Sequence, residues 1–238
     1  MTLVRRQEVI ILRWVLITVL AILSRPPTAF PESHAPWTLE SVLHELDSRA
    51  HGFKGFTADI ERTKVTVVVN DKSTEQGTIA VRGDKMRLEM TKPDSRTILR
   101  DGDDFYIYTP GLRRVEEYNL GGKRQMVDSF VLLGFGNSGK ELQSQYLLSF
   151  MGESPVDNRK AVKLELTPKS DDVRQQIAKI DLWLDESNWL PVQQQFFEAG
   201  TDDYFIIHYT NIVPNARIDE NTFKPKWPKG TQRLKHTT

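Results

Sequence analysis

The stretch from Met86 to Tyr118, MRLEMTKPDSRTILRDGDDFYIYTPGLRRVEEY, contains four short segments with the composition of β-strands, and the first of them alternates between apolar and polar residues. Tight-turn pairs separate these segments, namely Pro93-Asp94, Asp101-Gly102 and Pro110-Gly111. Strands spaced about ten residues apart with such turns between them are typical of an antiparallel meander rather than of βαβ units. The stretch therefore predicts strands at Met86–Thr91, Thr97–Arg100, Phe105–Thr109 and Arg113–Tyr118.

The same pattern continues on both sides of this stretch. Residues 56–60 alternate in polarity and lead into Val65–Val69, with a bulge expected between Ile60 and Val65 because the apolar parity shifts there. The other predicted strands lie at Gly77–Arg82, Lys160–Thr167, Gln176–Leu184, Val192–Ala199 and Tyr204–Ile212.

Two segments break the strand pattern. Thr38 can cap a helix whose apolar residues recur at helical spacing as far as Leu46, and Gly52 ends it. Residues 121–151 are helical or mixed in pattern and are apolar on more than one face. An open sheet of about ten strands must twist and curl, and its concave apolar face needs a cover. We therefore predict a mainly β protein with helices (α+β): an open antiparallel half-barrel of about ten to eleven strands, covered by an N-terminal helix and a helical lid insertion.

Glycines flank the most apolar part of this insertion. Gly121 and Gly122 precede it, and Gly134 and Gly136 follow it. Glycine leaves the backbone free to adopt many conformations, so these positions are expected to let a lid over residues 123–136 pivot at both ends.

The N-terminus has the parts of an export signal. Three arginines precede the apolar run Trp14–Leu23, and Pro26-Pro27 follow it. The run is about half the length that a membrane-spanning helix needs, which favours a cleaved signal peptide over the alternative of a permanent anchor. We therefore expect export to the periplasm.

The expected organisation has three parts. Residues 1–29 are predicted to be the signal peptide, 30–37 a linker, and 38–238 a single domain. Cleavage after Ala29 and cleavage after Ala35 both fit the small-residue rule.

Composition excludes several classes of protein. Apolar residues make up 39% and charged residues 27% of the 238-residue chain, values close to those of a soluble globular protein. No cysteine is present, which removes disulfides, thiolate metal sites and the lipid-bearing cysteine of a lipoprotein. Without the four arginines and one glutamate of residues 1–29, 28 basic and 31 acidic residues remain, a formal net charge of −3. This balance gives no support for nucleic-acid binding.

Apolar side chains of matching parity predict a lipid-binding surface. Methionine adapts to changing contacts, and the predicted third strand carries two on one face. Ordinary core packing is the alternative interpretation for each residue. Eight residues are expected to face a common apolar space: Met86, Leu88, Met90, Phe105, Ile107, Met126, Phe130 and Leu133. Three further lipid-binding candidates are Phe56, Ile60 and Leu182.

With these elements in place, the chain resembles the outer-membrane lipoprotein carrier family, the LolA-like proteins, over nearly all of the predicted mature chain. Four ordered segments carry the resemblance, and their order behind a signal peptide is more specific than any one of them. They are Phe56-Thr-Ala-Asp-Ile60, Met86-Arg-Leu-Glu-Met-Thr-Lys-Pro93, Asp101-Gly-Asp-Asp-Phe-Tyr-Ile-Tyr-Thr-Pro110, and Ile218-Asp219…Phe223…Pro228-Lys-Gly230.

The resemblance implies a monomeric carrier that shields the acyl chains of lipoproteins in transit through the periplasm. Membrane-bound donor and acceptor proteins would be its partners, and no cofactor or ATP would be needed. An arginine near the end of the family's second strand helps to latch the lid, and Arg82 is the nearest match. The family's usual aromatic residues on the third strand are replaced by Met86 and Leu88, so both a lipoprotein and another lipid remain candidate ligands.

Enzymatic alternatives have less support. The five histidines show no metal-ligand spacing, the pairs Asp103-Asp104 and Asp202-Asp203 fall in turns, and no GxSxG motif is present. We therefore predict no catalytic residue and no metal site. The segment from Gly134 to Glu141 satisfies GxGxxG, but a glutamate follows Lys140 where a phosphate loop needs Ser or Thr. A flexible loop is the favoured interpretation.

A second hypothesis outside enzymology is a periplasmic sensor or scaffold. It would use the same half-barrel to bind a regulatory protein or a lipid signal. Composition does not separate it from a carrier.

Overall fold

One open sheet of twelve strands dominates the computed structural model, which describes residues 36–123, 127 and 132–236. The strand order is β12-β6-β5-β4-β3-β2-β1-β11-β10-β9-β8-β7, and every neighbouring pair is antiparallel except β12 and β6. The predicted open antiparallel half-barrel is confirmed, with one to two more strands than expected. The predicted signal peptide, residues 1–29, lies outside the described residues.

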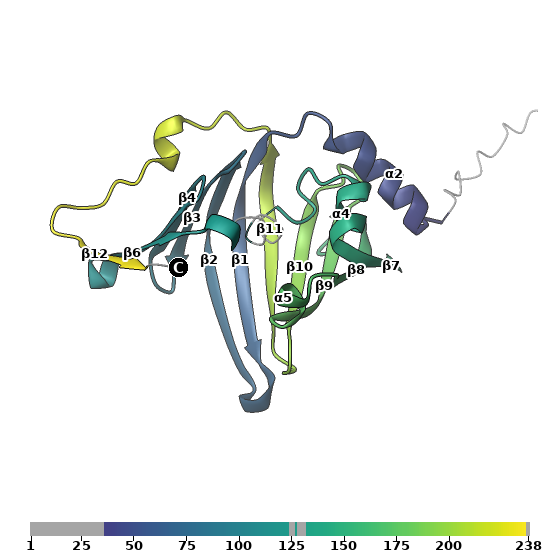
Figure 1. The fold of residues 1–238 in the computed structure, drawn as a ribbon. Coiled ribbons are helices and arrows are strands. Elements are labelled where there is room, and N and C mark those ends of the chain that lie inside the picture. The colour runs from purple at the N-terminus through teal and green to yellow at the C-terminus, as the bar shows by residue number, and fades with distance from the viewer. Residues whose placement is uncertain (1–35, 124–126, 128–131, 237–238) are drawn as a thin grey trace, which may run out of the picture. The chain divides into compact units, whose positions relative to one another are not determined.

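The sheet consists of two antiparallel meanders that meet at β1, which pairs with β2 on one side and with β11 on the other (Figure 1). The first meander comprises β1 Gly55–Thr66, β2 Asp71–Arg82, β3 Lys85–Lys92, β4 Arg96–Asp101, β5 Asp104–Thr109 and β6 Arg114–Asn119. The second comprises β7 Tyr146–Glu153, β8 Ala161–Pro168, β9 Ile177–Asp185, β10 Pro191–Glu198 and β11 Tyr204–Pro214, and β12 Gln232–His236 adds a parallel edge to β6.

Two details of the strands differ from the sequence prediction. β1 pairs with β2 without interruption from Gly55 to Thr66, so the bulge expected between Ile60 and Val65 is wrong. The irregularity lies instead between Thr57 and Asp59, against β11. Val65 remains in β1, and the valines that follow form a short 3-10 turn, η1 Val67–Val69, at the tip of the β1–β2 hairpin.

The insertion between the meanders is shorter than predicted. α4 covers Gly139–Gln145, and β7 begins directly after it at Tyr146, so the helical pattern does not extend to residue 151. Among the described residues, the other short helices are α5 Asp171–Arg174 and the 3-10 turns η2 Pro110–Leu112, η3 Gly121–Lys123 and η4 Glu220–Phe223.

The N-terminal helix α2, Leu39–Ala50, forms as predicted. Thr38 and Ser41 make a reciprocal capping box, which satisfies backbone donors of the first turn. Val42, Leu43 and Leu46 are buried against β8, β9 and α4 in one hydrophobic cluster. We call the face of the sheet that packs against α2, α4 and residues 132–135 the inner face, and the opposite face the outer face.

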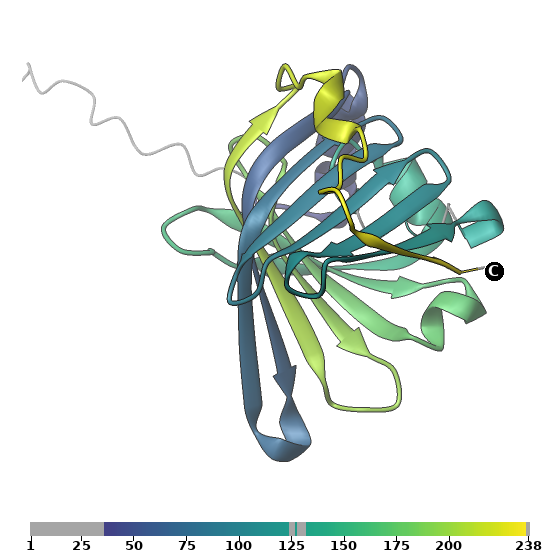
Figure 2. The same cartoon turned by 90° about the vertical axis from the view of Figure 1, so that its left-hand side faces the viewer.

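The outer face of the first meander is covered by the C-terminal segment 215–231, which crosses it in Figure 2. Phe223 of this segment is 1% exposed, and its Trp227 ring lies 5.0 Å from the ring of Tyr108. Leu99 on β4 and Val115 on β6 are fully buried. The C-terminal segment therefore covers apolar residues on the outer face of the first meander.

The close contact between α4 and α2 predicts a stability change. A methyl group on Gly139 would lie 2.8 Å from Leu43 Cβ and 2.9 Å from its carbonyl oxygen, so α4 would have to move away from α2. Gly139→Ala should lower the free energy of unfolding by about 1–3 kcal/mol in urea denaturation. Gly111→Ala is the matched control, since nothing lies within 4 Å of its added methyl. Equal stability of the two variants would contradict the tight packing of α4 on α2.

Candidate functional site

The inner face holds an apolar cleft of about 450 Å³ over strands β1 to β5 and β11, which we call the inner cleft. Leu88, Ile98 and Ile107 stand side by side on neighbouring strands because β3–β4 and β4–β5 pair in register at these positions. The strand alternation thus presents one apolar row to a single space. The apolar lining consists of Ile60, Leu88, Met90, Ile98, Ile107 and Ile207.

Four predicted lipid-binding residues, Ile60, Leu88, Met90 and Ile107, line this cleft. Ile98 and Ile207 were not among the predicted residues, although each lies at an inner-face position of its strand. Ile207 is informative because it packs against both of the large hydrophobic clusters.

The other described candidates form the core beside the cleft. Phe56 and Met86 are buried in the cluster of β1 to β3, and Phe105 packs against that cluster while partly exposed. Leu133 and Leu182 are buried in the second cluster, beneath the helices. Met126 and Phe130 lie outside the described residues, so their predicted role stays a prediction.

Residues 132–135 are fixed to the inner face by a buried polar relay. Tyr209 on β11 donates its hydroxyl to Gln194 Oε1 at 3.0 Å, and Gln194 Nε2 donates to the Leu133 carbonyl oxygen at 2.7 Å. Gln194 is fully buried, and burial raises the pKa of Tyr209. The Phe135 ring stacks on the Phe56 ring with centroids 3.9 Å apart. Sequence reasoning missed this relay because polar residues on strands usually face solvent.

Two glycines near this anchor, Gly134 and Gly136, were predicted to be free pivots for a lid. The structure places both in close contact: a methyl group on Gly134 would lie 2.8 Å from Pro191, and one on Gly136 would lie 2.3 Å from Phe53. Both have positive φ, so glycine is required for the turn as well. At this end of the insertion the glycines allow tight docking on the sheet.

Arg82, the expected lid latch, lies on the outer face. Its guanidinium donates to the Ile218 carbonyl oxygen at 2.7 Å, pairs with Glu220 and lies 5.3 Å from the centre of the Phe223 ring. Successive side chains of a strand point to opposite faces, and the preceding residue, Val81, faces inward. Arg82 therefore faces outward. Arg82 thus fastens the C-terminal segment, and its contacts do not support the latch role.

A different arginine, Arg100, lies on the inner face. It is 2% exposed, and it stands beside Met86 and Phe105 in the strand register. Its Nε donates to the Gly102 carbonyl oxygen at 2.9 Å. Arginine is rarely buried this completely, so this position stands out from the aliphatic residues around it. The alternating pattern of β4 could have pointed to it.

Charged side chains stand at one end of the inner cleft. Glu75 on β2 accepts hydrogen bonds from Arg62 Nη1 on β1, at 3.1 Å, and from Arg96 Nη2 on β4, at 3.0 Å. These three side chains line the cleft together with its apolar row. Their own side chains are between 23% and 38% exposed, so this end of the cleft meets solvent.

The inner face turns polar again at the edge strand β6. Tyr118 donates its hydroxyl to Glu116 at 2.7 Å, and Arg114 pairs with the same carboxylate at 3.0 Å. The hydroxyl of Tyr118, assisted by Arg114, holds the pKa of Glu116 below its usual range. The apolar row therefore ends at β5.

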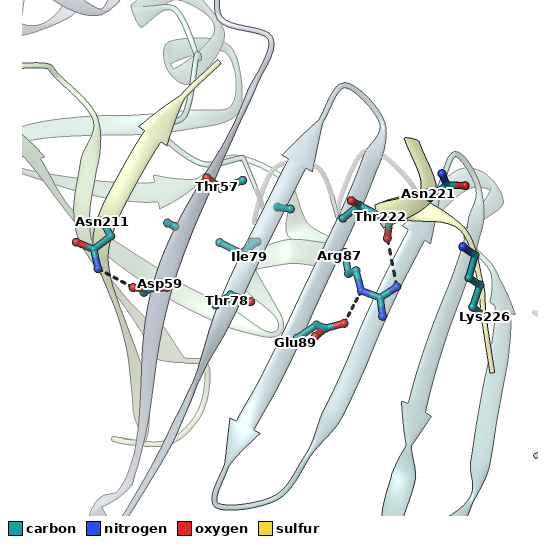
Figure 3. Close-up of a pocket in the computed structure, with 12 residues that line it drawn as sticks. Thr57, Asp59, Thr78, Ile79, Arg87, Glu89, Asn211, Asn221, Thr222 and Lys226 are labelled. Carbon is teal, nitrogen blue, oxygen red and sulfur yellow. Dashed lines mark hydrogen bonds and ion pairs between the residues drawn. The ribbon is translucent and has the colours of Figure 1, made fainter. Parts of the chain in front are cut away.

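The outer face has a second hollow, of about 500 Å³, between strands β1 to β3 and the C-terminal segment (Figure 3). Its walls carry hydrogen-bonded polar pairs: Asn211 donates to Asp59 at 2.7 Å, and Arg87 contacts Glu89 and the Thr222 carbonyl oxygen. A polar lining of this kind does not suit an acyl chain.

The glycine-rich segment 134–139 ends in a helix cap. Ser138 Oγ accepts from the Glu141 backbone at 3.1 Å, and the Glu141 carboxylate accepts from the Ser138 backbone at 2.8 Å. The glutamate therefore occupies the donors that a phosphate would need. Within the described residues, no three His, Asp or Glu side chains gather as metal ligands, and no helix is long and apolar enough to cross a membrane.

Comparison with known proteins agrees with this architecture. A family model described as "-like: Uncharacterized protein" matches residues 82–217, more than half of the chain. The chain belongs to this family. The matched residues of this family member include β3 to β11, and with them Leu133, Gln194 and Tyr209 of the buried relay.

Two curated relatives are similar to this family member. An outer-membrane lipoprotein carrier protein of Actinobacillus succinogenes is 23% identical over 201 residues, which cover 83% of this chain and 88% of the relative. An uncharacterized protein of Methanocaldococcus jannaschii is 22% identical over 195 residues, which are 82% of this chain. The match spans about half (53%) of that archaeal protein. The resemblance to the lipoprotein carrier family is confirmed.

A solved structure shares the fold. The crystal structure of an uncharacterized conserved protein from Thermus thermophilus aligns with a TM-score of 0.55 at 11% identity, over 84% of this chain and all of that chain. The two proteins therefore share the same overall fold.

The buried relay predicts an alkaline sensitivity. Tyr209 stays protonated in the folded state above about pH 10, where tyrosine in the unfolded chain ionises, so its contribution to stability is complete below that pH and declines above it. Tyr209→Phe should lower the free energy of unfolding by about 1 kcal/mol at neutral pH, since Gln194 loses its donor. The same variant should lose less stability than the parent between about pH 10 and 11. Parallel pH profiles for parent and variant, measured by urea denaturation, would refute the burial of this hydroxyl.

Proposed function

We propose that this protein is a periplasmic carrier that holds the acyl chain of a lipoprotein, or of a related lipid, in the inner cleft. The observation that carries the proposal is the row Leu88, Ile98 and Ile107, which lines an open cavity on the apolar face of an unclosed sheet. A protein without a ligand gains nothing from leaving such a row partly exposed, because its burial would be favourable.

The energetics of the cleft suit reversible carriage. Its volume of about 450 Å³ lies in the range of small-molecule sites. Each methylene that it buries contributes roughly 0.8 kcal/mol, so a chain that enters only in part is still held. A cleft built on paired strands is already formed, which keeps the ordering cost of binding low.

The sequence relatives support the same role. One of them is named an outer-membrane lipoprotein carrier protein, and the N-terminal apolar run of this chain suits export. In this proposal the protein is a monomer and performs no catalysis. Membrane-bound donor and acceptor proteins give the transfer its direction.

A substitution in the cleft tests the proposal. Leu88→Glu introduces a charge on the cleft wall and should reduce uptake of the uncharged dye N-phenyl-1-naphthylamine at least about tenfold, because a carboxylate opposes apolar burial there. Leu88 is only partly buried, so thermal unfolding should change little. Val68→Glu, at a site 87% exposed on the hairpin tip, is the matched control. Undiminished dye uptake by Leu88→Glu would show that the cleft is ordinary core.

Mass spectrometry of the protein purified from its native envelope separates the carrier from a sensor. A carrier should bring lipoproteins or lipids with it. A stoichiometric protein partner without lipid would instead favour a sensor or scaffold and would contradict the carrier.

A further inference from the structure

We infer that the inner cleft selects an acyl chain with an anionic headgroup, a carboxylate or a phosphate, which Arg62 and Arg96 bind at its solvent-facing end. This inference rests on the proposed function, because it assigns the ligand class of the same cleft. Neither the family description nor the names of the relatives assign a headgroup to it.

The two arginines stand beside the apolar residues of the cleft. Both line the cleft with Leu88 and Ile98. Arg96 stands opposite Met90, one register step to the side of the apolar row, so an acyl chain that covers the row can place its headgroup beside the two guanidinium groups. Arg62 and Arg96 come from strands β1 and β4, with β2 and β3 between them, and both reach toward Glu75 from opposite sides. The headgroup position is therefore flanked by cations on two sides.

The net charge at this end of the cleft also favours an anion. Two arginines share one glutamate, so the three charged residues of the cleft sum to a net charge of +1. A neutral or cationic headgroup would gain no electrostatic free energy on moving from water to this end of the cleft. An anionic headgroup would balance the remaining charge.

The two guanidinium groups also offer hydrogen-bond donors to a ligand. Arg62 and Arg96 each place one nitrogen on Glu75, and within the described residues the buried Nε of Arg96 has no acceptor. A guanidinium has five N–H donors arranged for two-pronged contact with carboxylate or phosphate oxygens. The Arg62 guanidinium is held 4.8 Å from the centre of the Phe205 ring, which limits the positions it can take.

Glu75 acts as an internal substitute for the ligand anion. While the cleft is empty, its carboxylate offsets the mutual repulsion of the two arginines and holds both near the cleft. When an anionic lipid enters, its headgroup either joins Glu75 or takes over part of its hydrogen bonds. Removal of the Glu75 charge should therefore strengthen binding, which a purely structural ion pair would not do.

The experiment compares two ligands with the same chain, dodecyl phosphate and monolauroyl glycerol, by displacement of N-phenyl-1-naphthylamine from the purified full chain. The parent protein should bind dodecyl phosphate about tenfold more tightly than the neutral ligand, the size of one lost charge-assisted contact. Arg96→Met should abolish this preference and leave the affinity for monolauroyl glycerol unchanged. Glu75→Gln should bind dodecyl phosphate about threefold more tightly than the parent.

Arg49→Met is the matched control, because this arginine lies on α2 and pairs only with Glu45 among the contacts of the described residues. Thermal unfolding checks that each variant is folded, and Glu75→Gln keeps the test valid if Arg96→Met is unstable. Equal affinities of the parent for the two ligands would overturn the headgroup inference and leave the carrier intact. Binding of neither ligand would overturn the carrier itself. Displacement by inorganic phosphate as effective as by dodecyl phosphate would also overturn the inference, since the site would then recognise the anion without a chain.

Discussion

The structure depends on the docking of residues 132–135 at the centre of the inner face. These residues meet both meanders: Phe135 stacks on Phe56 of β1, while Leu133 is buried in the cluster beneath the helices and is held by Gln194 of β10. An open sheet without this anchor would expose the apolar residues of its central strands. The anchor closes the centre, and the inner cleft remains on the side of β3 to β5.

The charges in the cleft are better explained by function than by stability. Arg62, Glu75 and Arg96 are each about a quarter to two fifths exposed, and ion pairs of that exposure contribute little to folding. Placing them beside an apolar row also removes part of their hydration. A sequence selected for stability alone would place apolar residues at these three positions.

The sequence predicts the local features of the fold because strand alternation, turn pairs and the α2 cap are all short-range signals. It does not predict β12, since Gln232–His236 is polar and becomes a strand only through its parallel pairing with β6. It places four of the cleft residues correctly because parity fixes the face of a strand. It misplaces Arg82, which lies one residue beyond Val81 and so faces outward. Contacts between distant segments, such as Gln194 with Leu133, leave no local pattern.

The C-terminal segment explains how the first meander can keep a cleft on its inner face. β3, β4 and β5 need apolar burial on at least one face, and the outer face supplies it through Leu99 and Phe223, both almost completely buried. Arg82 and Arg87 fasten the segment through backbone carbonyl oxygens of Ile218 and Thr222. These strands are therefore stabilised from outside the cleft, whether or not a ligand fills it. A carrier needs this separation, because strands stabilised only by the bound acyl chain would lose their packing each time the ligand was delivered.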